Sequence, residues 1–255
     1  MFFLKRRTWF GPTTKLLILG IGAYFLLAGM VRTYNFTVVR SVEREIAVLA
    51  PVLVDRVVVV DPGHGGPDPG VVRDDVKEKD ITLEVAFRLA TFLEQAGSRV
   101  ILTRKEDRDL AEPPFKGSRK RRDLEKRVAI ANENSADVFV SVHVNSFPSS
   151  RECGAQTFYH PGSPGGRELA LAIQNECKTL LGNTRRKPKE GDYFTGRATK
   201  MPSVVVEIGF LTNPREFELL QEPDYQSKVA FAIYAGLVRY FAAQSGVDSP
   251  APVKQ

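Results

Sequence analysis

The sequence predicts one three-layer α/β domain, a mostly parallel twisted sheet flanked by helices, behind an N-terminal membrane anchor. Two observations support this prediction. Apolar, β-branched strands alternate with amphipathic helices from residue 56 to residue 243, which is the pattern of a parallel sheet covered on both faces. An apolar run also follows a basic flank at the very start of the chain, which is typical of an exported or membrane-bound protein.

Residues 1–32 are predicted to be a signal or membrane anchor. The apolar run over 16–31 follows four basic residues, Lys5, Arg6, Arg7 and Lys15. It is short for a spanning helix, which needs about 20 residues, but long for the 7–15 residues of a signal-peptide core. No persuasive small-x-small cleavage site follows, so an uncleaved anchor is favoured over a cleaved signal. Because basic residues stay on the cytoplasmic side, both alternatives predict a single-pass membrane protein or an exported one, with its folded part outside the cytoplasm.

Residues 33–55 are predicted to be a stalk that leads to the folded domain at 56–243. In that domain, Arg56–Asp61 is a continuous β-branched run, as expected for a strand covered on both faces. A helix follows over 78–96, and Gly97 ends it. One face of this helix carries its apolar residues Ile81, Val85, Leu89, Phe92 and Leu93.

The alternation continues to the end of the domain. Further strands are predicted over 99–103, 137–143, 154–159 and 203–207, and further helices through Leu124, Val128 and Ala131, over 164–181, and over 224–243. The segment 244–255 is polar and contains proline, so we expect a flexible tail.

The charge balance indicates an anionic partner. The net charge is +6 and the sequence pI is about 9.3, which favours membrane surfaces, nucleic acid or cell-wall polymers. The signal is weak because part of the excess lies at the extreme N-terminus. The basic run Lys116–Arg122 is interpreted as a solvated surface, with contact to an anionic wall polymer as the alternative.

Polar residues follow or end three of the predicted strands. His64 lies in a glycine-rich turn after the first strand, His143 ends a later strand, and Glu207 ends the last buried one. The carboxyl ends of parallel strands meet at one edge of a sheet, so these side chains are expected to lie close together. Glu78, which opens the first helix, is a fourth candidate.

Two histidines and two glutamates fit a catalytic zinc site. Zinc takes three protein ligands and keeps one position open, while a free carboxylate moves the proton. The residues alone leave open which glutamate binds the metal. A lone histidine in a glycine-rich loop is usually structural, but His64 and His143 end separate strands at one edge, which favours a metal. His160, inside a turn signature, is interpreted as structural.

Six motifs along the domain resemble those of the zinc-dependent N-acetylmuramoyl-L-alanine amidases of the type-3 class. They occur in the family's order and span the domain: Val59–Gly66 (VVDPGHGG), Glu78–Asp80 (EKD), Ile101–Arg104 (ILTR), Arg127–Asn132 (RVAIAN), Ala136–Asn145 (ADVFVSVHVN) and Val206–Asn213 (VEIGFLTN). With its N-terminal anchor, the compact chain is most similar to the amidases that act on the spore cortex during germination of spore-forming bacteria.

The resemblance implies a role for each residue. His64, Glu78 and His143 are expected to bind one Zn²⁺ per chain, and Glu207 to be the catalytic acid and base. By this assignment Glu207 deprotonates the attacking water and then protonates the departing amine of L-alanine. The expected reaction is hydrolysis of the bond between N-acetylmuramic acid and L-alanine in peptidoglycan.

The resemblance also implies partners. Asn145 and Arg197 are expected to lie beside the substrate. The expected partners are peptidoglycan and, through the N-terminal helix, the membrane. Nucleic acid is not expected as a partner. An activating or anchoring protein partner is left open. Two alternatives remain: a zinc carboxypeptidase, for which Arg197 is the nearest cationic candidate, and a non-catalytic wall-binding module, which predicts loss of a ligand or of the base.

Overall fold

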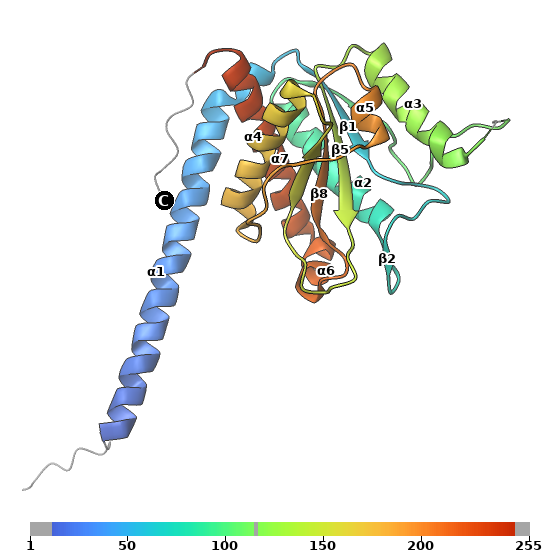
Figure 1. Ribbon diagram of the computed structural model, residues 1–255. Helices are drawn as coiled ribbons and strands as arrows, with labels where there is room; N and C mark the ends of the chain where they lie inside the picture. The colour runs from blue at the N-terminus through green and yellow to red at the C-terminus, as the bar shows by residue number, and fades with distance from the viewer. Residues whose placement is uncertain (1–11, 115–116, 248–255) are drawn as a thin grey trace, which may run out of the picture. The chain divides into compact units, whose positions relative to one another are not determined.

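The computed structural model describes residues 12–114 and 117–247 (Figure 1). The chain forms two units, residues 1–45 and residues 46–255. The basic residues Lys5, Arg6 and Arg7 of the predicted anchor lie outside the described residues, as does the segment 248–255 of the predicted tail. The predicted boundaries of anchor, stalk, domain and tail remain predictions.

Helix α1 (Pro12–Leu49) contains the apolar run of the predicted anchor. Its apolar window has a mean hydropathy of 1.8 and is not buried. In the described ranges, this is the one helix long and apolar enough to cross a membrane. The same helix continues through residues 33–49 of the predicted stalk and is followed by the short 3₁₀ helix η1 (Ala50–Leu53). Helix α1 is therefore a candidate anchor.

A six-stranded sheet forms the centre of the second unit. Its order is β4–β1–β5–β8–β6–β7. The strands are β1 (Val57–Pro62), β4 (Arg99–Leu102), β5 (Val138–Asn145), β6 (Gln156–Tyr159), β7 (Lys189–Glu190) and β8 (Ser203–Phe210). All neighbouring pairs are parallel except β6 and β8, which are antiparallel. The prediction of a mostly parallel sheet is confirmed.

Helices cover both faces of this sheet (Figure 1). One layer holds α2 (Glu78–Gln95), α4 (Pro164–Leu181) and α7 (Pro223–Gln244), with α7 packed against the other two. The opposite layer holds α3 (Arg119–Glu133) and the short α5 (Phe194–Ala198). On that side Val59 of β1 and Phe139 of β5 pack with Ala131 of α3 in one buried cluster. The expected three-layer fold is confirmed.

The structure adds short elements that periodicity did not reveal. A two-stranded hairpin, β2 (Val72–Arg73) with β3 (Val76–Lys77), precedes α2, and α6 (Pro214–Gln221) follows β8. Two predicted strand ends were also wrong. Strand β5 continues past His143 to Asn145, and β8 continues past Glu207 to Phe210, because the apolar residues beyond each polar one are still buried in the sheet.

Candidate metal centre

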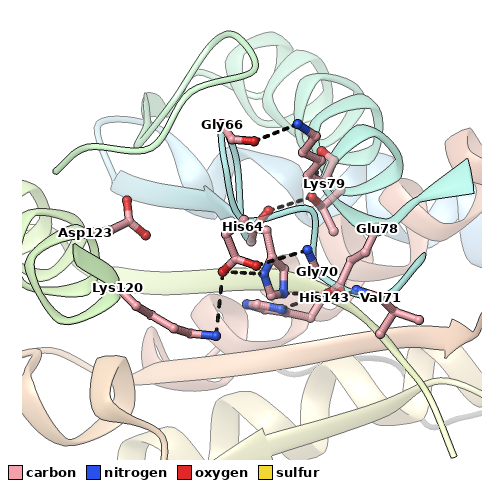
Figure 2. Close-up of polar contacts among 12 residues, drawn as sticks. His64, Gly66, Gly70, Val71, Glu78, Lys79, Lys120, Asp123 and His143 are labelled. Atoms are coloured by element: carbon pink, nitrogen blue, oxygen red, sulfur yellow. Dashed lines mark hydrogen bonds and ion pairs between the residues drawn. The ribbon is translucent and has the colours of Figure 1, made fainter. Parts of the chain in front are cut away.

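Three of the predicted site residues converge at the carboxyl ends of the strands (Figure 2). His64 follows β1, Glu78 is the first residue of α2, and His143 lies in β5. Glu78 Oε1 lies 3.2 Å from His64 Nε2 and 3.0 Å from His143 Nδ1. One nitrogen or oxygen from each residue lies within 4.8 Å of the others, and no second group of this kind occurs in the part of the chain that the structure describes.

Two glycines make this convergence possible. A Cβ atom on Gly63 would lie 2.4 Å from His143 Cε1, so the imidazole occupies the space that any side chain would fill. Gly70 has a φ of +68°, and a Cβ atom there would lie 2.5 Å from Glu78 Oε2. Between them, His64 itself has a φ of 61°, a conformation that non-glycine residues adopt at a cost. The turn is therefore shaped around the imidazole and carboxylate groups.

Two of the ligand candidates, His64 and Glu78, are also held by further contacts. His64 Nδ1 lies 2.9 Å from Asp68 Oδ2, which leaves Nε2 facing Glu78. The Glu78 carboxylate accepts hydrogen bonds from the backbone N–H groups of Val71 (2.8 Å) and Val144 (2.9 Å). Orientation of a histidine by a carboxylate on its second nitrogen is the usual arrangement at metal sites.

Two buried arginines hold the turn that carries His64. Arg127 of α3 donates to the carbonyl oxygens of Pro62 (2.7 Å) and His64 (2.6 Å) and pairs with buried Asp61 at 2.7 Å. Arg104 donates to the carbonyl of Gly63 at 3.0 Å. These charge-assisted bonds satisfy carbonyl groups that the turn takes out of the sheet, so the backbone beneath His64 is fixed on two sides.

Glu207 lies beside the cluster, in a different environment. It is the register partner of His143 in the β5–β8 pair. The residue is 8% exposed, and its Oε2 is buried without a hydrogen-bond partner among the described residues. Burial, with the nearby Glu78 carboxylate, raises the pKa of Glu207 to about 7 against the opposing effect of His143 and His64.

The pKa of Glu78 moves the other way. Burial alone would raise it, but hydrogen bonds with His143 and His64 outweigh burial and hold the pKa of Glu78 well below its usual value. Burial works to lower the pKa of His143, yet its hydrogen bond to Glu78 and the charges of Glu207 and Glu78 raise it. The pKa values of the two carboxyls are therefore shifted in opposite directions, lowered for Glu78 and raised to about 7 for Glu207.

The donor set fits a zinc ion. Two imidazole nitrogens and one carboxylate oxygen are ligands that catalytic zinc sites use. Tetrahedral zinc with bonds of about 2.0–2.1 Å separates its ligands by about 3.3 Å, close to the separations of 3.0 and 3.2 Å measured from Glu78 Oε1. The two separations from Glu78 thus fit a metal held by all three residues.

The histidines open into a cavity of about 280 Å³. One wall comes from α3, through Lys120, and the other from α5 and the residue before it, through Tyr193 and Phe194. Lys120 Nζ lies 3.6 Å from Asp68 Oδ2 (Figure 2). The walls are joined where Arg121 stacks over the Phe194 ring at 4.0 Å. The cavity gives a substrate access to the cluster.

The two predicted substrate contacts lie outside this cavity lining. Asn145 ends β5, and its side-chain oxygen accepts from the N–H of Ser146. Arg197 in α5 is about half exposed and forms an ion pair with Asp192. Their roles remain predictions. His160 is not part of the cluster and lies 3.8 Å from Asp192.

Sequence reasoning missed the residues that support the site. Asp68, Lys120 and Tyr193 follow no strand end, so the rule that located the histidines could not find them. Arg127 stands between apolar residues on the buried side of a helix, and a charge in that position is a signal of a buried ion pair that could have been used.

A family model and individual known proteins match most of the domain. A family model described as N-acetylmuramoyl-L-alanine amidase matches residues 58–239. The germination-specific N-acetylmuramoyl-L-alanine amidase of Bacillus subtilis is 45% identical over 190 residues, which cover 73% of this chain and 80% of that protein.

Solved structures agree with this match. The CwlD amidase of Clostridioides difficile, in complex with the GerS lipoprotein, has 36% identity and a TM-score of 0.71 over 74% of this chain and all of that one. An N-acetylmuramoyl-L-alanine amidase of Clostridium difficile 630 has 29% identity and a TM-score of 0.67 over 74% of this chain and 98% of that one.

Proposed function

Since this chain belongs to the N-acetylmuramoyl-L-alanine amidase family, we propose that it hydrolyses the amide bond between N-acetylmuramic acid and L-alanine of peptidoglycan with one zinc ion. His64, Glu78 and His143 would hold the ion. The observation that carries this proposal is the convergence of these three side chains within 4.8 Å beside a buried carboxylate, Glu207, that binds none of them.

Glu207 is the group suited to move the proton. Burial and the Glu78 carboxylate raise the pKa of Glu207 to about 7 before a metal binds, and a general base is most effective when its pKa lies near the working pH. Glu207 Oε2 has no partner in the described structure, so it is free to accept a proton from the attacking water and to return it to the departing amine of L-alanine. When bound, zinc supplies a Lewis acid that polarises the amide carbonyl and makes water more acidic.

The other residues of the site orient the metal ligands and line the cavity. Asp68 holds the His64 ring through Nδ1, and Glu78 receives two backbone N–H groups that fix its carboxylate. Lys120 and Tyr193 line the cavity through which a substrate reaches the cluster. The pKa of Tyr193 is raised to about 12, by burial and by the Glu207 charge, so its hydroxyl stays a neutral hydrogen-bond donor.

The proposal also covers the role of the chain, its location and a protein partner. The similarity to a germination-specific amidase supports a role in remodelling of spore-cortex or other cell-wall peptidoglycan. Helix α1 supports attachment to a membrane with the domain outside the cytoplasm. Because one structural neighbour was solved with a lipoprotein, we also expect a protein partner that activates or anchors this chain.

The product distinguishes the candidate reactions. The full chain in detergent micelles is incubated with purified peptidoglycan, and the released material is analysed by mass spectrometry. The proposal predicts free stem peptides that begin with L-alanine, and glycan strands without peptides. Release of single C-terminal amino acids would indicate a carboxypeptidase instead. Binding without any cleavage would indicate a wall-binding module.

A further inference from the structure

A second cavity of the second unit lies away from the metal cluster. It has a volume of about 710 Å³ and shares no lining residue with the catalytic cavity. Three exposed arginines from different segments line it: Arg151 from the loop after β5, Arg185 from the loop after α4, and Arg215 from the first turn of α6. We call this cavity the arginine pocket.

The two glutamates that line the pocket already form contacts within the protein. Glu216 is 2% exposed, and its carboxylate accepts hydrogen bonds from the N–H groups of Gly154 and Phe210, both at 2.8 Å. Glu152 forms an ion pair with Arg186, whose guanidinium also stacks 4.7 Å from the centre of the Phe210 ring. These contacts hold the walls together and use up both carboxylates.

The guanidinium groups of the three arginines that define the pocket form no such contacts. No hydrogen bond or ion pair of the Arg151, Arg185 or Arg215 guanidinium is formed within the described ranges 12–114 and 117–247. Such guanidinium groups present paired N–H donors that match carboxylate and phosphate oxygens. Four arginines and two glutamates line the cavity, so its lining carries a net positive charge, although Arg215 lies near enough to Glu216 to oppose the rise that burial causes in the pKa of that carboxyl.

The pocket lies on the catalytic edge of the sheet. Phe210, which bonds to Glu216, is at the end of the same strand as Glu207, about 10 Å farther along at the usual rise of a strand. The carboxyl end of β8 therefore places both Glu207 and a wall of the arginine pocket.

We propose that the arginine pocket binds an oxyanion group, carboxylate or phosphate, of the anionic cell-wall polymer and so retains the substrate outside the catalytic cavity. The choice of the wall polymer as ligand rests on the proposed function; the choice of an oxyanion rests on the three arginines.

The test compares two full-length variants that lose the same charge. One is Arg151→Gln/Arg185→Gln/Arg215→Gln. The other is Lys105→Gln/Lys126→Gln/Arg167→Gln, a control at three exposed basic residues that line neither cavity. Binding to insoluble peptidoglycan is measured in a Glu207→Gln background, so that the polymer is not consumed. Thermal melting confirms that both variants fold.

The pocket variant should bind the wall about tenfold or more weakly, as expected for the loss of charge-assisted hydrogen bonds, and the control variant should bind nearly as wild type. With Glu207 restored, both should cleave a small N-acetylmuramoyl-L-alanine fragment without distal acidic groups at the wild-type rate. Wild-type binding by the pocket variant, or equal weakening in both variants, overturns the proposal. Failure of every chain to cleave the fragment counts against the proposed function alone.

Two treatments of the wall identify the source of the oxyanion. One removes teichoic acids and their phosphates, and the other amidates the carboxylates of the stem peptides. If the difference between wild type and the pocket variant disappears after the first treatment, the ligand is a phosphate; if after the second, a carboxylate. If the difference survives both treatments combined, the pocket does not recognise an oxyanion and the proposal is wrong.

Discussion

Glu78 and Glu207 are the same side chain in opposite environments. The Glu78 carboxylate has hydrogen bonds to two histidines and two backbone N–H groups, and its pKa is held low. The Glu207 carboxylate is also buried, but one oxygen has no partner in the described chain, and its pKa is raised to about 7. This contrast supports the proposal that Glu78 binds the metal and that Glu207 transfers the proton.

The burial of Glu207 should lower the free energy of unfolding at pH values where its carboxyl is ionised. Its pKa is raised from 4.5 to about 7 in the folded chain, so its stabilising contribution is complete below pH 4.5 and is lost as pH rises through 7. In the presence of a chelator, Glu207→Gln should therefore be more stable than wild type by on the order of 1–3 kcal/mol at pH 8, and nearly equal at pH 4.5. Urea denaturation at both pH values measures the difference. A constant difference across this range would contradict the raised pKa.

Asp68 should act on the metal through His64. Asp68→Asn keeps the size of the side chain but removes the charge beside His64 Nδ1, and loss of such a contact typically weakens metal binding about 10–100-fold. Zinc affinity measured by competition with a chromogenic chelator checks this. Asp75→Asn, an exposed aspartate in the same segment, serves as the control. An unchanged zinc affinity in Asp68→Asn would show that Asp68 does not support metal binding.

At the scale of elements, the turn after β1 depends on a helix that is distant in sequence. Arg127 of α3 reaches the Pro62 and His64 carbonyls and pairs with Asp61 and Asp123. The pKa of Asp61 is held below its usual value: burial raises it, but Arg127, Ser141 and Thr103 together outweigh burial. Removing one partner from such a network leaves a buried charge without compensation.

Arg127→Met should accordingly destabilise the domain by about 3–5 kcal/mol. Arg127→Lys should recover little, because an ammonium group cannot reproduce the forked contacts to two carbonyls and two carboxylates. Chemical denaturation of the chelator-treated protein tests both variants. Lys126→Met, at the exposed neighbouring position, is the control and should change stability little. A stable Arg127→Met variant would show that the buried pair is not needed to hold the turn.

The sequence predicted long elements better than short ones. Helices over 78–96, 164–181 and 224–243 were found within a residue of their observed ends, since each has a complete apolar face and clear end signals. The hairpin β2–β3 and helix α5 were missed because two to five residues show no period. The cluster of His64 and His143 was predictable, because parallel strands deliver their ends to one edge. The support from Asp68 and Arg127 was not, because it depends on tertiary packing.

At the scale of the whole molecule, the chain combines an apolar helix, a candidate membrane anchor, with a domain of the amidase family. A reporter enzyme fused after residue 50, active only outside the cytoplasm, should be active in intact cells. Its activity is expected because the basic N-terminus stays on the cytoplasmic side. A second reporter, active only in the cytoplasm, should be silent at the same position. The opposite pattern would contradict the topology.

In the proposed zinc amidase, metal binding and proton transfer belong to different glutamates. The most direct measurement is zinc content beside amide cleavage for Glu78→Gln and Glu207→Gln. Wild type should hold about one zinc per chain. Glu207→Gln should keep its zinc while the rate falls by about 10²–10⁴, whereas Glu78→Gln should lose zinc affinity, and added zinc should restore part of its activity. Loss of zinc in Glu207→Gln with zinc and activity intact in Glu78→Gln would show the roles to be reversed, and wild-type cleavage by both would place the catalytic site elsewhere.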